Sequence, residues 1–211
     1  MSSGELPRFK VNYLRFLQET QRPQIDVDRL ERIIKHEVSL SVKLLSLLNS
    51  AAFGLSQQVT SLKRALLLLG EDRLRKWASV VVLAGLGEDQ PSELAVTGLI
   101  RAQFCEFLSS AAGDTRLDYF LTGMLSILDA LVGQPMEKAL EGLFVPESVR
   151  KALLGECNSE RSVLDLVLAY ERGAWGDIAE RAHALGLDEP DVTNAYRDAV
   201  SWANDVFGAG R

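Results

Sequence analysis

Side chains that could hold a metal ion or act as a general base are scarce in this sequence. It contains two histidines, His36 and His183, and neither stands in a carboxylate-rich motif with the spacing that metal ligands need. His183 lies in "AERAHALG", near the predicted end of a helix, where the helix dipole mildly favours a protonated imidazole. It is therefore best explained as a residue on a helix face.

The two cysteines give no stronger sign of chemistry. Cys105, in "AQFCEFL", has bulky apolar neighbours, so a buried thiol is favoured over a nucleophile. Cys157, in "ECNS", is expected in an exposed turn, where the adjacent acid disfavours a reactive thiolate. Two distant cysteines form neither a disulfide framework nor a Cys-rich zinc site.

One basic stretch, "RLRKW", could bind an anion or a nucleic acid. It places Arg73, Arg75 and Lys76 directly before Trp77. The favoured alternative is a solvated helix face with Trp77 in the core, because two acidic residues precede the stretch and weaken its field. A formal charge of −6 and a pI near 5.1 also disfavour nucleic acid as the main partner.

The composition is that of a globular domain with one sizeable core. The chain has 211 residues, of which 47% are hydrophobic and 25% charged. The strongly apolar, uncharged stretch 77–87 is shorter than the roughly 18 residues that a membrane span requires, and no apolar signal segment opens the chain. We expect a cytoplasmic protein without a membrane anchor.

Apolar residues recur at helical spacing, and the alternation typical of strands is nearly absent, which predicts an all-α bundle. The segments "LSVKLLSLLN" and "WASVVVLAGLG" are apolar all round and should lie in its centre. The predicted helices are 9–20, 26–36, 39–50, 61–69, 71–86, 91–112, 117–133, 135–142, 146–154, 160–172, 174–185 and 189–207.

Two blocks, "ERIIKHEVSLSVKLLSLLNSAAFG" and "TSLKRALLLLG", stand in order and at close spacing. Together they resemble the HDOD family, the HD-related output domain of bacterial signalling proteins. Later segments resemble the version of this domain that follows an EAL domain, a cyclic di-GMP phosphodiesterase-like unit, so the resemblance covers nearly the whole chain. The residues that carry the family signature are Leu45, Leu48, Asn49, Ser50, Phe53, Gly54 and Gly70.

These signature residues have a structural explanation. Asn49 and Ser50 can satisfy the free carbonyls at the end of a buried Leu-rich helix through side-chain hydrogen bonds. Phe53 would return to the core, Gly54 would permit the turn, and Gly70 would close the next helix in the left-handed conformation. The alternative, that Asn49 and Ser50 bind a ligand, is the less favoured of the two.

The resemblance also allows a comparison with the phosphohydrolases of the HD superfamily. These enzymes hold their metal with an adjacent His-Asp pair in a motif like "aGLLHDIG". The matching stretch here is "TGMLSILD", which puts Ser126 and Ile127 at the two ligand positions, with Asp129 nearby but alone. Isoleucine cannot ligate a metal, so we expect no enzyme activity and assign no catalytic, cofactor-binding or metal-binding residue.

The resemblance implies a non-catalytic regulatory or scaffolding domain that acts through protein contacts, with a role in cyclic di-GMP signalling. Its expected partner is an EAL-type or receiver domain. Two alternatives are a degenerate metal-dependent phosphohydrolase and a small-molecule or nucleotide sensor that uses the vestigial cavity. We expect 1–23 to form an N-terminal helix and joint to a preceding signalling domain and 24–211 to form the HDOD domain, so that the chain is either an excised domain or a truncated member of the family.

The sequence suggests two surfaces for such a contact. The first is the N-terminal helix around Tyr13 and Phe16, which is more apolar than one docked face requires, and which could meet a preceding domain or a second copy in a homodimer. Docking of this helix on its own bundle is an equally good explanation. The second is the face around Arg73 and Trp77.

Overall fold

The computed structural model describes residues 8–22, 24–35, 62–86, 92–141, 143 and 145–209. Within these ranges the chain forms eleven helices and no strand, which confirms the predicted all-α class. No helix among them is long and apolar enough to cross a bilayer. The predicted helix 39–50 and the signature residues from Leu45 to Gly54 lie outside the described residues.

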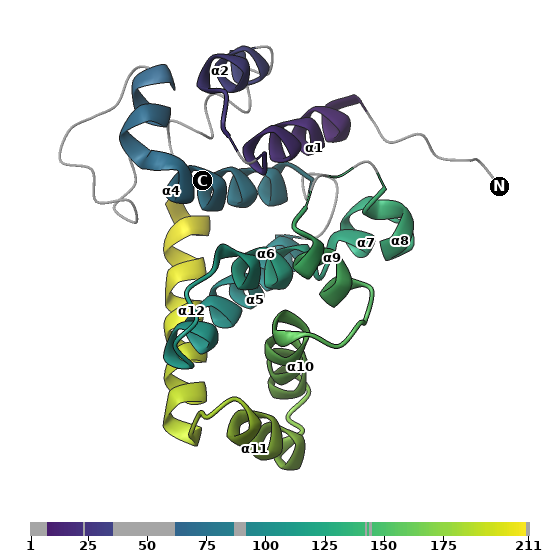
Figure 1. Cartoon of the computed structure of the whole chain (residues 1–211), viewed down its shortest axis with the longest axis vertical. Helices are drawn as coiled ribbons and strands as arrows, with labels where there is room; N and C mark the ends of the chain where they lie inside the picture. Colours follow the sequence, from purple (N-terminus) through teal and green to yellow (C-terminus); the bar gives the residue numbers. More distant parts are fainter. Residues whose placement is uncertain are drawn as a thin grey trace.

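From α5 onward the helices follow one another with short connections (Figure 1). They are α1 (Arg8–Thr20), α2 (Val27–Lys35), α4 (Leu62–Leu86), α5 (Ser92–Ala111), α6 (Leu117–Leu125), α7 (Leu128–Val132), α8 (Met136–Ala139), α9 (Glu147–Leu153), α10 (Ser159–Glu171), α11 (Trp175–Ala184) and α12 (Glu189–Ala209).

Side-chain caps fix several helix starts where the sequence predicts them. At α12, Asp188 Oδ1 accepts a hydrogen bond from the backbone N–H of Asp191 at 2.8 Å, and Asp191 Oδ2 accepts one from the N–H of Asp188 at 3.0 Å. At α10, Asn158 Oδ1 accepts from the N–H of Arg161 at 2.7 Å. Each cap satisfies an amide that the first helical turn leaves without a partner, which stabilises the start of the helix by about 1 kcal/mol.

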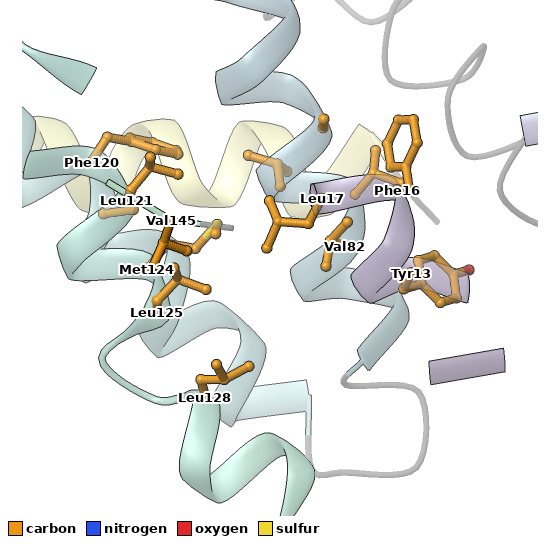
Figure 2. Close-up of a cluster of buried hydrophobic side chains, with 14 of the residues drawn as sticks. Tyr13, Phe16, Leu17, Val82, Phe120, Leu121, Met124, Leu125, Leu128 and Val145 are labelled. Carbon is orange, nitrogen blue, oxygen red and sulfur yellow. The ribbon is translucent and has the colours of Figure 1, made fainter. Parts of the chain in front are cut away.

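Helix α5 lies between two hydrophobic clusters, and both use its side chains. The first, here called the N-terminal cluster, joins α1, α2 and α4 to α6–α9 and includes Leu99 and Ala102 of α5. Figure 2 shows its centre, where Tyr13, Phe16 and Leu17 of α1 lie beside Val82 of α4. The predicted burial of the apolar stretch that begins at residue 77 is confirmed for residues 77–82.

The second cluster, here called the C-terminal cluster, joins α5 to α10, α11 and α12. Phe104, Cys105 and Leu108 of α5 are buried in it at 0% exposure, as the sequence predicts for the thiol. Helix α12 runs along one side of the molecule, while α10 and α11 lie at the end opposite α1 and α2 (Figure 1). The two clusters therefore lie toward opposite ends of the molecule and meet at α5, and α6 and α12 also contribute side chains to both.

Helix α4 has a kink at Gly70, which divides it into the two helices predicted as 61–69 and 71–86. Gly70 has φ 70° and ψ 167°. The positive φ was expected, but the ψ angle lies outside the left-handed helical region, in a region open almost only to glycine. Gly70 therefore redirects the chain into a second helical half and does not close the helix with a left-handed cap.

Helices α5 and α6 cross at very close range. A Cβ atom placed on Gly123 of α6 would lie 2.3 Å from the carbonyl oxygen of Arg101 and 2.8 Å from the Cα of Ala102, both in α5. Only a residue without a side chain fits at this crossing. The contact holds the backbone of Arg101 against the end of α6, where the candidate site begins.

Candidate functional site

The two residues at the metal-ligand positions of the HD motif lie in a break between helices. The sequence predicts one helix over 117–133, and this prediction is wrong, because α6 ends at Leu125 and α7 begins at Leu128. The hydroxyl of Ser126 donates a hydrogen bond to the carbonyl oxygen of Gly123 at 2.7 Å. This side-chain bond competes with helical pairing of the backbone and favours the break.

Arg101 of α5 binds this break. Its Nη1 donates to the Ser126 hydroxyl at 3.0 Å, while Nε and Nη2 donate to the two carboxylate oxygens of Glu171, each at 2.8 Å. The Arg101 side chain is 17% exposed and that of Glu171 is 27% exposed. Paired, charge-assisted hydrogen bonds of this kind are among the strongest polar contacts between side chains. We call these three residues the Arg101 triad.

The Arg101 triad does not suit a divalent metal ion. The guanidinium of Arg101 carries a permanent positive charge that would repel a cation, and the carboxylate of Glu171 is already paired with that guanidinium. Ile127 is 4% exposed and packs in the N-terminal cluster. Asp129 Oδ1 accepts from the N–H of Ala130 at 2.8 Å. In the described part of the chain, no three His, Cys, Asp or Glu residues gather as metal ligands would.

The histidine and the two cysteines that the structure describes are not members of the triad. His183 is exposed on α11, as predicted, and His36 is outside the described ranges. Burial raises the pKa of the Cys105 thiol, so this residue has little thiolate character. Cys157 is free and exposed.

The basic stretch is largely used within the fold. Arg75 donates to the carbonyl oxygen of Thr20 at 2.7 Å, which ties α4 to the end of α1. Lys76 pairs with Glu106, and its Nζ lies 4.7 Å from the ring centroid of Phe120. Arg73 is exposed. Trp77 is buried, as the favoured alternative expected, but Arg75 and Lys76 are 15% and 26% exposed and bind partners within the fold, so this face is less solvated than that alternative expected.

The four residues considered for an interface differ in accessibility. Tyr13, Phe16 and Trp77 are 2%, 0% and 0% exposed, and the rings of Phe16 and Trp77 meet edge to face with centroids 6.3 Å apart. A Cβ atom at Gly85 would collide with the Tyr13 ring, so the absence of a side chain at this position lets the ring pack against α4. Helix α1 is therefore docked on its own bundle, which is one of the two alternatives given for it above. Of the four residues, Arg73 is the one whose side chain is exposed.

Sequence reasoning missed Arg101 and Glu171. The two are separated by 70 positions, and no local spacing in the sequence links one to the other. The one local signal is a single charge within the otherwise uncharged stretch "GLIRAQF" on α5, which a buried helix carries at a cost unless the charge is paired.

The fold and this site define an all-helical domain of the HD type in which an ion-paired arginine stands beside the metal-ligand positions. The sequence matches the family described as "HDOD domain" over residues 6–154, and the chain belongs to that family. Helices α10–α12 follow the matched range.

Two curated proteins resemble the chain along most of its length. The cyclic di-GMP phosphodiesterase CdgJ of Vibrio cholerae is 31% identical over 195 residues, which cover 92% of this chain and 45% of CdgJ. The uncharacterized protein YuxH of Bacillus subtilis is 29% identical over 213 residues, covering 99% of this chain and 52% of YuxH. The chain therefore spans about half the length of these relatives. No solved structure matches it.

Proposed function

We propose that this chain is a non-catalytic regulatory domain of bacterial signal transduction that acts through protein contacts in cyclic di-GMP signalling. The observation that carries the proposal is the Arg101 triad, in which a guanidinium binds Ser126 at the first of the two metal-ligand positions. The phosphohydrolase chemistry of the HD superfamily needs a divalent cation there, and a fixed positive charge opposes one. The proposed partner is an EAL-type phosphodiesterase domain.

The resemblance to CdgJ supports the signalling context, since that protein is named a cyclic di-GMP phosphodiesterase. This chain matches 45% of CdgJ, so the remaining part of that protein can carry the activity in its name. A domain without chemistry can influence such an activity only by contacting different states of its partner with different affinity.

A first experiment tests for catalysis. The purified protein is examined by elemental analysis and assayed with cyclic di-GMP and a phosphomonoester, with and without a chelator. We expect no stoichiometric transition metal and no hydrolysis. One or two tightly bound metal ions per chain, with hydrolysis that a chelator abolishes, would establish the degenerate phosphohydrolase instead. A thermal-shift panel of nucleotides on the same sample tests the sensor alternative.

A second experiment tests for the protein contact. An EAL-type phosphodiesterase domain is titrated with this chain, and both binding and the turnover of cyclic di-GMP are measured. We expect saturable binding and a change in turnover at saturation. Absence of binding to EAL-type and receiver domains alike would remove the partner class that we propose.

A further inference from the structure

A groove between α11 and α12 is not used by the Arg101 triad. It encloses about 270 Å³. Its apolar lining includes Ile178, Ala182, Leu187 and Val192. Trp175 lines it from the start of α11, and Glu189 lines it from the start of α12. A volume of this size holds one long side chain, and it is smaller than the cavities that typically enclose a drug-sized ligand, about 300–1,000 Å³.

The turns on either side of α11 position this groove. After α10, Gly173 has φ 64°, and the N–H of Ala174 donates to the carbonyl of Ala169 at 3.1 Å. After α11, Gly186 has φ 72°, and the N–H of Leu187 donates to the carbonyl of Ala182 at 2.9 Å. Both patterns are Schellman motifs, in which glycine adopts the left-handed conformation. They reverse the chain twice and bring α11 against α10 and α12.

Trp175 is unusually exposed for its size. It opens α11, and its residue exposure is 71%, whereas Trp77 is fully buried and Trp202 is partly buried. One edge of the indole meets Tyr170, with centroids 6.2 Å apart and the rings at 75°. The rest of the ring faces solvent beside the groove, and tryptophan in such a position is frequent among residues that dominate binding energy.

The charge around the groove is negative. Glu189 lines the groove, is exposed, and has no ion pair or side-chain hydrogen bond with any residue that the structure describes. Between positions 175 and 194 the sequence has five acidic residues and one arginine. That arginine, Arg181, is directed to Asp165 of α10 at 3.7 Å. Arg172, just after α10, is not part of the groove lining. The groove thus combines an apolar floor, an aromatic wall and an unpaired carboxylate.

We propose that this groove docks a protein segment that presents one lysine or arginine between apolar residues. The methylene stem of the basic side chain would cover the apolar floor, and its charge would meet Glu189 and the face of Trp175. This inference rests on the proposed function, because the docked segment would belong to a signalling partner. It names the surface of this chain that binds the partner and the kind of side chain that this surface recognises.

Peptide probes test the chemistry. The first is a fluorescein-labelled peptide of nine residues with a central lysine flanked by leucine and alanine, and two companions carry norleucine or glutamate at the centre. Binding to the full chain is measured by fluorescence anisotropy. The indole N–H signal of Trp175 in an NMR spectrum, assigned by its loss in Trp175→Phe, reports the place of binding. We expect the lysine peptide to bind about fivefold more tightly than the norleucine peptide and to shift this signal.

Matched variants separate the groove from the rest of the surface. Glu189→Gln should weaken the lysine peptide about fivefold and leave the norleucine peptide unchanged. Trp175→Ala should weaken both. Glu180→Gln, an exposed carboxylate of α11 outside the groove lining, and Leu154→Ala, another exposed apolar residue, should change neither. Circular dichroism and thermal unfolding check that each variant is folded.

Several outcomes would overturn the inference. They are equal binding of the lysine and norleucine peptides, equal effects of Glu189→Gln and Glu180→Gln, and no binding of the lysine peptide at millimolar concentration. A concentration-dependent dimer that Trp175→Ala dissociates would assign the groove to a second copy of the chain and would overturn it as well.

The EAL-type domain distinguishes this inference from the proposed function. If that domain binds the parent and the Trp175→Ala and Glu189→Gln variants equally well, the groove inference fails and the proposed function stands. If it does not bind the parent, but the peptides behave as expected, the groove inference stands and the proposed partner fails. Weaker binding of both variants, with Glu180→Gln unchanged, supports both.

Discussion

The crossing of α5 and α6 at Gly123 gives the sharpest test of the fold around the Arg101 triad. The Cβ atom of Gly123→Ala would stand 2.3 Å from the carbonyl oxygen of Arg101, where ordinary contacts begin at 3.4 Å. The two helices would have to separate by about 1 Å, because both colliding groups are backbone and neither can rotate away. Overpacking of a core costs about 1–3 kcal/mol, and we expect a loss near 3 kcal/mol in the free energy of unfolding.

Urea unfolding followed by circular dichroism measures this loss. Gly176→Ala is the matched control, because no atom lies within 4 Å of the Cβ that it would add in α11. Alanine is the better helix former, so this control should be neutral or more stable than the parent by up to about 1 kcal/mol. If Gly123→Ala unfolds at the same urea concentration and with the same slope as the parent, the close approach of α5 and α6 is refuted.

Three further predictions concern an ion pair, a carboxylate and the thiols. Arg116→Gln should lower the free energy of unfolding by about 2 kcal/mol, because the carboxylate of Glu160, 2% exposed, loses the guanidinium 2.9 Å away. The control Arg197→Gln breaks an exposed ion pair and should lower that free energy by less than about 0.5 kcal/mol. Equal losses for the two variants would contradict the importance of the buried carboxylate. The pKa of Asp114 is lowered to about 2, below its value in the unfolded chain, mainly by a hydrogen bond from Arg116. The ionised Asp114 carboxylate therefore stabilises the fold fully above about pH 4, and this stabilisation is lost as the pH falls from 4 to 2. Urea midpoints over this pH range should fall less steeply for Asp114→Asn than for the parent, and parallel curves would refute the assignment. In a thiol-reagent assay the native protein should show one fast thiol, Cys157, while the second, buried and with a raised pKa, should react only after denaturation; two fast thiols would contradict its burial.

Local sequence signals predicted most of the described helices. A cap such as Asp188 acts within a few residues, and the ends of α10, α11 and α12 fall within about two positions of their predicted places. The burial of Cys105 followed from its apolar neighbours for the same reason.

Features that depend on distant residues were not predictable from such signals. The break at Ser126 lies inside an apolar helical pattern, and its stabilisation depends partly on Arg101, which belongs to another helix. The link from Arg101 to Glu171 and the groove beside Trp175 arise only when three or more helices have packed. For the candidate site, sequence identified Ser126 and Ile127 as unsuited to a metal, while the arginine beside them came from the structure.

The position of α5 between two clusters has a consequence for how the domain unfolds. Ala102 packs in the N-terminal cluster and Phe104 in the C-terminal cluster, only two residues apart on one helix. If the helices around either cluster unfolded, one face of α5 would lose its packing and expose apolar surface that the remaining cluster cannot cover. The two halves should therefore melt as one cooperative unit, and amides of α5 should be among the last to exchange with deuterium, through whole-molecule opening and not through local fraying.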